Sequence, residues 1–404
     1  MDKRLIILLT AGLILALVAT VGFTLYNSNV ESKDYTAELQ TLLQTQLANY
    51  TASYPGFQGG LAMKVLTSNG DYFVSAEYGN SVTDGIHFRT ASVTKTFTAA
   101  AIMKLYQEGK LNIDDKITQP IPGTSVPYIP DTMAYAIPYK GEITIRQLLG
   151  HRAGVFDVDN TPIPQNISQP YAGRVYVQWV ESIDPLHQFS CDELVGVVAT
   201  NQLTYFKPGT NYHYSDTGYS MLGKIVERAS GQTYDDYVYQ HLVTPNGLTQ
   251  TNLVSSANIT TLPEPYAEGY SYSLGQSYNT TEYNMSPHTA EGNVITTPAD
   301  LARWGQLLYS GKAGINSTLV AMMMDVIPFD NQGHYYGLGT QYTEDLGYGH
   351  NGGVMGYLTL MRTDPQKQFT IVISANGINF DNLAGQINFL IDIAKQAKQL
   401  TTDN

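Results

Sequence analysis

The hydrophobic and polar positions predict that the folded part of the chain begins with a helix and two strands. Leucines at helical spacing predict a helix over residues 38–50. Two strand-like runs follow at 61–66 and 72–77, with Asn69-Gly70 between them. Because Asn-Gly between apolar runs is a strong short hairpin signal, these runs are expected to pair as a β-hairpin.

Further along, strand patterning fades and returns only near the end, while helical segments and Pro-rich loops fill the interval. The helices expected here are 92–105, 143–149, 219–228, 234–242, 298–308 and 383–400. The strands expected are 337–342, 357–363 and 369–375, and a loop or short hairpin is expected over 269–286. This order predicts an α+β fold: one antiparallel sheet built from both ends and flanked by the N- and C-terminal helices, plus an all-helical lobe.

The same patterns predict the domain organisation. Residues 36–398 are expected to form one domain, with a sheet lobe from about 36–110 and 330–398 and a helical lobe over about 111–329. The polar residues 27–35 are expected to be a linker.

The first residues resemble an export or anchoring signal. Lys3 and Arg4 precede an uncharged apolar run over 5–25, near the length that spans a bilayer. This pattern predicts a signal anchor or signal peptide over 5–26, with residues 1–4 as a cytoplasmic tip. A domain at the cell membrane, held outside the cytoplasm, is therefore expected, or a secreted domain if the segment is cleaved.

The composition narrows the classes of partner and cofactor. Lys and Arg number 22 against 35 Asp and Glu, a net charge of -13, which disfavours nucleic acid because its binding requires a basic patch. Cys191 is the only cysteine, so neither an intrachain disulfide nor a cysteine-based metal site can form. The eight histidines form no H-E-x-x-H pattern, so no metal or other cofactor is expected, and a metallohydrolase is disfavoured.

Ser92 and Lys95 lie at the start of the helix expected over 92–105. A spacing of three puts both side chains on one face of the first turn, where the amine is within hydrogen-bond reach of the hydroxyl. A nucleophilic serine needs a base, and a desolvated lysine can lose its proton and take that part. Taken alone, the pattern favours a serine helix cap and a surface lysine, because Ser-x-x-Lys occurs by chance about once in a chain of this length.

Two other segments carry candidate chemistry. Tyr214 precedes a helix, where nearby lysines would lower the pKa of its phenol and let it shuttle a proton. The Gly-rich segment 349–356 precedes a strand pair, so its backbone can approach a ligand and His350 can donate a hydrogen bond. With 30 tyrosines in the chain, a packing tyrosine is the competing interpretation of Tyr214, and a plain turn that of the glycines.

Taken in order, these segments form a recognisable set: Ser92-Val-Thr-Lys95, Tyr214-Ser-Asp216 and His350-Asn-Gly352. The set resembles the serine β-lactamase and penicillin-binding-protein superfamily, in the branch with class C β-lactamases, D,D-carboxypeptidases, D-aminopeptidases and related esterases. That branch carries S-x-x-K, Y-x-N, and K-T-G or H-x-G in this order. The resemblance covers about 36–398 and implies a β-lactamase/transpeptidase-like fold.

The resemblance implies a serine hydrolase in which Ser92 attacks a carbonyl and forms an acyl-enzyme. Lys95 and Tyr214 would share the proton of Ser92, and the sequence leaves open which of them is the base. The backbone N–H groups of Ser92 and Gly353 would form the oxyanion hole. His350 would bind the carbonyl or carboxylate of the substrate at the edge of the sheet, beside Gly352 of the same motif.

Two residues depart from the family pattern. Asp216 stands where the family usually has Asn, and a carboxylate only accepts hydrogen bonds. We expect it to pair with Lys95, hold that lysine charged and shift the role of base toward Tyr214, and it could favour substrates that offer an amine. His350 replaces the lysine of penicillin-handling enzymes, and a mostly neutral imidazole holds a carboxylate weakly. Weak or absent β-lactamase activity is therefore expected.

The function expected from the sequence is acyl transfer from small peptides, D-amino-acid amides or esters, and the sequence does not separate peptidase from esterase. The alternative is a non-catalytic module that binds peptides or cell-wall fragments on the same fold, for which Asp216 is the main support. An α/β-hydrolase is disfavoured because the chain has no G-x-S-x-G. The sequence leaves the oligomeric state open.

Overall fold

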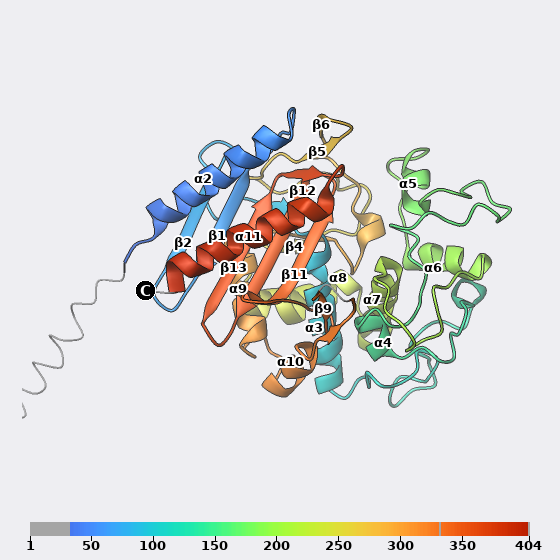
Figure 1. The fold of residues 1–404 in the computed structure, drawn as a ribbon. Coiled ribbons are helices and arrows are strands. Elements are labelled where there is room, and N and C mark those ends of the chain that lie inside the picture. The colour runs from blue at the N-terminus through green and yellow to red at the C-terminus, as the bar shows by residue number, and fades with distance from the viewer. Residues whose placement is uncertain (1–32, 331–332, 403–404) are drawn as a thin grey trace, which may run out of the picture. The chain divides into compact units, whose positions relative to one another are not determined.

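The computed structural model describes residues 33–330 and 333–402. The chain divides into two units, Met1–Tyr35 and Thr36–Asn404. Every helix and strand that the structure describes belongs to the second unit (Figure 1).

The expected localisation at a membrane is corrected by the structure. Within the described residues, no helix combines the length and the hydrophobicity that a bilayer span requires. The anchor expected at 5–26 and the cytoplasmic tip expected at 1–4 lie outside the described residues.

The main sheet has eight antiparallel strands in the order β2-β1-β13-β12-β11-β10-β9-β8. Its strands are β1 Leu61–Leu66, β2 Asp71–Ala76, β8 Ile327–Pro328, β9 Tyr335–Tyr336, β10 Gln341–Thr343, β11 Gly347–Val354, β12 Tyr357–Asp364 and β13 Phe369–Ala375. In β1, Met63 lies opposite Val74 of β2 on one side and Ile373 of β13 on the other. The prediction that both ends of the sequence build one antiparallel sheet is therefore confirmed.

Two three-stranded sheets accompany the main one, in the orders β3-β7-β4 and β14-β5-β6. Their strands are β3 Phe88–Arg89, β4 Asn252–Leu253, β5 Tyr270–Ser273, β6 Gln276–Asn279, β7 Val294–Thr296 and β14 Gly377–Asn379. The hairpin β5–β6 lies within the segment where a loop or short hairpin was expected.

The described α-helices include every predicted helix and three further ones that the sequence analysis did not predict, at 176–181, 191–200 and 317–323. In chain order, the described α-helices are α2 Thr36–Ser53, α3 Thr94–Gln107, α4 Ile145–Leu149, α5 Tyr176–Glu181, α6 Cys191–Thr200, α7 Asp216–Ser230, α8 Tyr234–Val238, α9 Pro298–Tyr309, α10 Ser317–Met323 and α11 Leu383–Thr402. Local signals set several of the ends: Thr144 and Gln147 form a capping box on α4, Ser215 caps α7, and Gly231 ends α7 in the left-handed conformation. The α+β fold is confirmed, whereas the proposed division into a sheet lobe and a helical lobe stays a prediction.

Helices cover both faces of the main sheet. Figure 1 shows α2 and α11 side by side on one face, with α3 and α9 on the other. Phe97 of α3 and Trp304 of α9 stack with ring centroids 4.1 Å apart, and the Trp304 indole donates to Thr96 Oγ1 at 2.9 Å. Such an aromatic pair adds about 1 kcal/mol beyond its buried area. This contact fixes α3, which follows the candidate nucleophile, against the helix that packs on β12 and β13.

The structure differs from the predictions at two places near the motifs. A 3₁₀ turn, Ala91–Val93, holds Ser92, and the α-helix begins only at Thr94. The Gly-rich segment 349–356, expected to precede a strand pair and with a plain turn as its competing interpretation, belongs to strand β11 as far as Val354. Glycine is depleted in strands, so its frequency here did not indicate one. The glycines are needed because this strand passes so close to neighbouring backbone that larger side chains would not fit.

Candidate active site

Ser92 sits on a turn whose backbone is held from two sides. Ala91 has φ of 51°, a left-handed conformation that a residue with a Cβ rarely adopts. The turn is fixed to β7, because the backbone N–H and the hydroxyl of Thr90 both donate to the carbonyl of Val294, at 3.0 and 3.1 Å. A strained conformation held in this way is typical of functional sites.

The glycines of β11 let that strand pass directly beside the turn. A Cβ placed on Gly352 would lie 2.0 Å from the carbonyl oxygen of Thr90 and 2.9 Å from the backbone nitrogen of Ser92. Only glycine permits this approach. Gly353 follows and lines the same pocket as Ser92.

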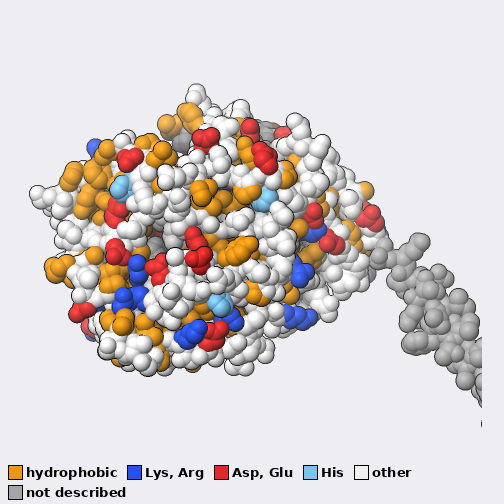
Figure 2. All heavy atoms as spheres, turned by 180° about the vertical axis from the view of Figure 1, so that it is seen from behind, with side chains coloured by type: hydrophobic (Ala, Val, Ile, Leu, Met, Phe, Trp, Pro, Cys, Tyr) orange, Lys and Arg blue, Asp and Glu red, His pale blue; other side chains and the backbone are white. Residues whose placement is uncertain are grey.

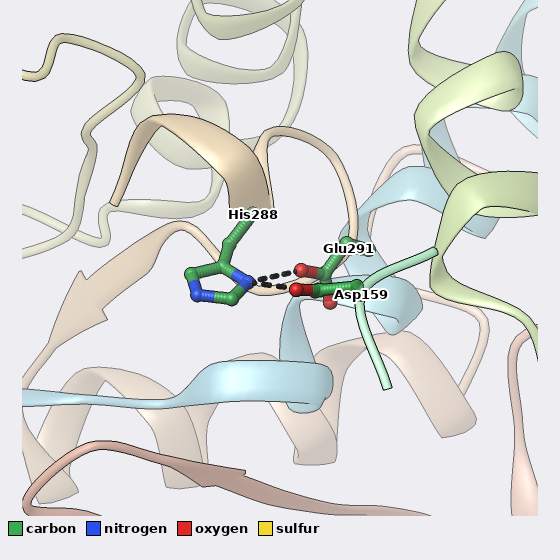
Figure 3. Close-up of side chains that lie close together, drawn as sticks. All are labelled: Asp159, His288 and Glu291. Atoms are coloured by element: carbon green, nitrogen blue, oxygen red, sulfur yellow. Dashed lines mark hydrogen bonds and ion pairs between the residues drawn. The ribbon is translucent and has the colours of Figure 1, made fainter. Parts of the chain in front are cut away.

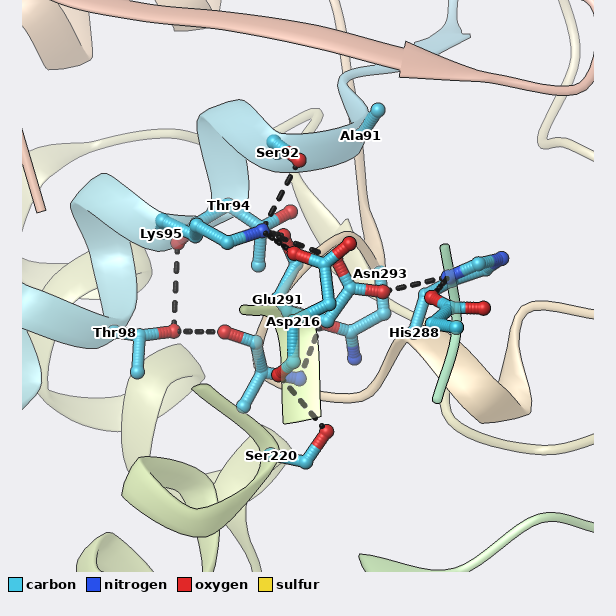
Figure 4. Close-up of polar contacts among 12 residues, drawn as sticks. Ala91, Ser92, Thr94, Lys95, Thr98, Asp216, Ser220, His288, Glu291 and Asn293 are labelled. Carbon is cyan, nitrogen blue, oxygen red and sulfur yellow. Dashed lines mark hydrogen bonds and ion pairs between the residues drawn. The ribbon is translucent and has the colours of Figure 1, made fainter. Parts of the chain in front are cut away.

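Lys95 is fully buried and contacts Ser92 directly (Figure 4). Its ammonium donates to Ser92 Oγ at 3.0 Å and to the backbone carbonyl of Glu291 at 2.9 Å. Two carboxylates also reach it: Asp216 Oδ1 at 2.6 Å and Glu291 Oε2 at 3.1 Å. The spacing of three residues thus brings the hydroxyl and the amine together, as the sequence predicted.

The two carboxylates decide the charge of Lys95. Burial alone would lower the pKa of its amine, but Asp216, Tyr214 and Glu291 together raise that pKa well above its usual value. Lys95 is therefore an ammonium ion at neutral pH. For Asp216, burial and the nearby Glu291 raise the pKa of the carboxyl, while Lys95 and Asn160 oppose the rise.

Asn160 links Asp216 to a second buried acid. Its amide nitrogen donates to Asp216 Oδ2 at 2.6 Å and to Asp157 Oδ2 at 3.0 Å. Burial, together with Asp216 and Asp159, raises the pKa of Asp157 well above its usual value. This environment therefore favours the protonated form of Asp157.

Tyr214 lies against Lys95, with the ammonium 4.9 Å from the centroid of its ring. The ring also packs against His151, with centroids 4.1 Å apart. Burial raises the pKa of the Tyr214 phenol well above 10, and the positive charge of Lys95 only partly offsets the rise. The side chain is consequently a phenol, not a phenolate, at neutral pH.

His350 is buried, and both of its ring nitrogens have partners within the protein. Nδ1 lies 2.5 Å from the carbonyl oxygen of Asn351, which can only accept, and Nε2 lies 3.0 Å from the hydroxyl of Tyr336. Burial and the charge of Lys95 lower the pKa of this imidazole well below 6.5. His350 is therefore neutral and occupied by internal hydrogen bonds.

A pocket opens in front of Ser92, with a volume of about 100 Å³. Ser92 and Gly353 contribute to its lining, as do the carboxylates of Asp159, Asp216 and Glu291. Neither His350 nor Gly352 is among the described residues that line it. Of the residues predicted from sequence, Ser92, Asp216 and Gly353 line the pocket. Lys95 does not line it but contacts both Ser92 and Asp216, and Tyr214 lies against Lys95. His350 and Gly352 are not part of the lining.

Sequence reasoning missed Asp159, His288 and Glu291, which form a cluster beside the pocket (Figure 3). His288 Nδ1 lies 2.6 Å from Glu291 Oε1 and 3.2 Å from Asp159 Oδ2. The spacing His288-x-x-Glu291 was a usable signal, but nothing local connects these residues with Asp159. The three could also surround a metal ion, since their ligand atoms lie within 4.8 Å of one another.

The short distances within this cluster favour a shared proton over a metal ion. Burial lowers the pKa of His288, but Asp159, Tyr283 and Glu291 raise it to a value well above 6.5. A protonated imidazole donates from Nδ1, which suits two carboxylates at hydrogen-bond distance. His288 therefore acts as a cation that orients Glu291, which in turn contacts Lys95.

Comparison with known proteins identifies the family. The family model described as Beta-lactamase matches residues 58–392. The chain belongs to the Beta-lactamase family. This membership confirms the superfamily predicted from the three motifs and places the chain in a family of serine hydrolases.

Known relatives of this Beta-lactamase family member include penicillin-binding proteins. Penicillin-binding protein 4* of Bacillus subtilis is 27% identical over 302 residues, covering 72% of this chain and 60% of the relative. A putative D-alanyl-D-alanine carboxypeptidase of Escherichia coli is 34% identical over 182 residues, covering 45% of this chain and 37% of the relative. The chain thus spans less than two thirds of the length of both relatives.

Solved structures share the fold of this family member. A D-stereospecific amidohydrolase from Streptomyces sp. has a TM-score of 0.70 at 22% identity, covering 85% of this chain and 95% of that one. D-amino acid amidase from Ochrobactrum anthropi, in complex with L-phenylalanine amide, has a TM-score of 0.68 at 21% identity, covering 89% of this chain and 99% of that one. Both likenesses concern the fold alone.

Proposed function

We propose that this protein is a serine hydrolase that forms an acyl-enzyme on Ser92, with small amides, peptides or esters as substrates and D-amino acid amides as the favoured class. The observation that carries the proposal is the contact of 3.0 Å between Ser92 Oγ and the buried Lys95 ammonium, at the edge of a pocket. The amidases named among the structural neighbours, which share the fold, supply the substrate class.

In the proposed mechanism, the proton of Ser92 travels through Lys95. Lys95 passes one of its protons to Asp216 Oδ1, 2.6 Å away, as it takes the proton of Ser92, and Ser92 Oγ forms a bond to the substrate carbonyl carbon. The proton held on Asp216 then returns through Lys95 to the leaving group as the bond between that group and the carbonyl carbon breaks. The raised pKa of Tyr214 disfavours its use as the base, the role that the sequence was expected to shift toward it, and also makes its phenol a weak proton donor. Water then releases the acyl group from Ser92.

Backbone N–H groups would stabilise the oxyanion in this mechanism. The candidate donors are those of Ser92 and Gly353, on the turn and on β11 respectively. Removing one donor from such a pair typically costs about 3 kcal/mol of transition-state stabilisation. The close approach that Gly352 permits supports this assignment, because it keeps the two backbones adjacent.

A fluorescent phosphonate probe tests the proposal on the full-length chain. We expect covalent labelling that is lost in Ser92→Ala and retained in Ser310→Ala, a matched change of an exposed serine that follows α9. A panel of p-nitrophenyl esters and D-aminoacyl amides then separates esterase from amidase activity. Labelling that persists in Ser92→Ala would contradict the proposed nucleophile.

One observation favours the alternative, a non-catalytic module that binds peptides. Lys95 is held as an ammonium ion between Asp216 and Glu291, and in that state it cannot itself accept the proton of Ser92. Absence of labelling, together with saturable binding of D-aminoacyl amides without turnover, would support this second function.

A further inference from the structure

We propose that the pocket in front of Ser92 selects substrates that carry a positively charged amino group on their acyl part, and that Asp159 and Glu291 are the residues that recognise it. The proposal rests on the proposed function, because it assumes that the acyl part of a substrate occupies this pocket during attack by Ser92. It adds to the favoured class, D-amino acid amides, the requirement that the amino group of the substrate be positively charged.

The charge of the pocket wall is the first argument. Three carboxylates line the pocket, from Asp159, Asp216 and Glu291, and the cations in contact with them are Lys95 and His288. Three carboxylates therefore face two cationic side chains. The surplus negative charge favours a cationic ligand group and repels an anionic one.

A neighbouring acid adds to this surplus. Burial raises the pKa of Glu181 to about 7, with the charge of His288 opposing the rise. Glu181 is therefore partly ionised at neutral pH.

The free acceptor on Asp159 is the second argument. Its side chain is only 10% exposed, and its Oδ2 contacts His288 Nδ1 at 3.2 Å. Its Oδ1 receives no hydrogen bond from any residue in the described part of the chain, although the side chain lines the pocket. This oxygen is accessible at the pocket, so it can accept a hydrogen bond from a ligand.

The third argument is the position of Glu291 relative to the reacting atoms. Its Oε2 contacts Lys95 at 3.1 Å, and Lys95 contacts Ser92 Oγ at 3.0 Å. The Glu291 carboxylate and Ser92 Oγ therefore contact the same ammonium group. We expect an amino group on the carbon next to the reacting carbonyl to face this wall while the carbonyl faces Ser92.

The cation that lines the pocket, His288, is already paired with Asp159 and Glu291, so it is poorly placed to hold a substrate carboxylate. The described residues that line the pocket include no lysine or arginine. His350 stands where penicillin-handling enzymes carry a lysine. Its imidazole is neutral and is hydrogen-bonded to Asn351 and Tyr336. The pocket thus differs in charge preference from a site that binds anionic substrates.

The test compares D-alanine p-nitroanilide with N-acetyl-D-alanine p-nitroanilide on the full-length chain. We expect kcat/KM to be about 10-fold to 100-fold higher for the free amine, the range for a hydrogen bond to a charged group. The ratio should fall as the pH rises through the pKa of the substrate amine, near 8. This pH dependence needs no variant and separates charge recognition from a steric effect of the acetyl group.

Variants assign the effect to residues. Asp159→Asn, which keeps shape and removes charge, should reduce the ratio of the two kcat/KM values toward one. Asp392→Asn removes an exposed carboxylate on α11, away from the pocket, and should leave the ratio at its wild-type value. A ratio that Asp159→Asn leaves unchanged would overturn the assignment to Asp159.

Hydrolysis of p-nitrophenyl acetate, which lacks an amine, keeps the two proposals distinguishable. If Ser92-dependent ester hydrolysis occurs while the wild-type anilide ratio is one or lower, the charged-group proposal is overturned and the serine hydrolase stands. If neither ester hydrolysis nor phosphonate labelling depends on Ser92, the proposed function fails and the substrate preference fails with it.

Discussion

At the scale of single residues, the main feature of the site is that two carboxylates form ion pairs with the same lysine. Asp216 and Glu291 both contact the buried Lys95 ammonium, at 2.6 and 3.1 Å, so a proton taken from Ser92 must move on to a carboxylate. An asparagine in place of Asp216 could still accept a hydrogen bond from Lys95 but could not take up a proton at neutral pH. The aspartate therefore changes the chemistry of the motif and not only its packing.

Asp216→Asn should lower kcat for a D-aminoacyl amide by about 100-fold, which is within the usual contribution of a general base. The measurement is steady-state kinetics of the wild type and the variant, with thermal melting to confirm that the variant folds. Unchanged or faster turnover would mean that Lys95 itself accepts the proton once one carboxylate is removed.

The pH profile gives a second prediction for Asp216. Its carboxyl must be ionised to accept a proton, so activity is present above its pKa and lost as the pH falls through it. Because burial raises this pKa, the acidic limb of kcat should lie above the value of about 3.9 that is usual for aspartate. A profile that stays flat down to pH 4 would contradict the assignment.

His288 makes a prediction about stability. Its folded-state pKa lies well above 6.5, because Asp159, Tyr283 and Glu291 outweigh the effect of burial. The stabilisation it provides is full below about pH 6.5, the unfolded-state pKa, and is lost as the pH rises through the folded-state value. The wild-type Tm should therefore decline with rising pH in this window, and His288→Gln should show a shallower decline.

At the scale of elements, β11 shows where sequence reasoning succeeds and fails. Helical stripes and the Asn69-Gly70 signal located α2 and the β1–β2 hairpin, because local pattern and final structure agree there. The same reasoning placed the Gly-rich part of β11 before a strand and not within one, because its glycines are required by contacts with residues that are distant in the sequence. A Cβ on Gly352 would meet Thr90, and one on Gly349 would meet the carbonyl of Met361.

In the candidate site, too, some residues could be predicted from the sequence and others could not. Ser92 and Lys95 could be found because they lie one turn apart. Glu291 could not, because it meets Lys95 across 196 residues of sequence. Asp159 likewise approaches His288 only through the tertiary fold. The family motifs supplied Asp216, while its charged partners depended on packing.

Gly352→Ala tests the role of β11. The added methyl would lie 2.0 Å from the carbonyl oxygen of Thr90, so the strand must move away from the turn that holds Ser92. We expect loss of phosphonate labelling by at least about 10-fold, because a small misplacement of catalytic groups has large kinetic effects. Gly141→Ala, where a Cβ meets nothing within 4 Å, is the matched control and should label normally.

At the scale of the whole molecule, net charge adds to the local preference of the pocket. The chain carries a net charge of -13, although acidic and basic side chains are interspersed on the face shown in Figure 2. An overall negative field slows the approach of anions and favours cations, and salt screens both effects.

Nitrocefin, an anionic β-lactam, should therefore be turned over weakly or not at all. Any measurable kcat/KM for it should rise with ionic strength, whereas that for a cationic D-aminoacyl amide should fall. Steady-state assays at low and high salt measure the kcat/KM of both substrates. Nitrocefin turnover at rates typical of dedicated β-lactamases would contradict the expected charge preference.

The pairing of β1 with β13 also has a consequence for synthesis on the ribosome. Residues near position 60 find partners only when segments more than 300 positions later have emerged, as in the hydrogen bond from Gly60 to Asn376, 316 residues apart. Until then, the nascent β1–β2 hairpin presents an open edge to other chains. Ser92, the proposed nucleophile, is likewise synthesised long before β11, which carries the proposed oxyanion donor Gly353. A chain that ends prematurely after α9 would contain Ser92 without that strand. The proposed activity could therefore arise only in the last stage of synthesis.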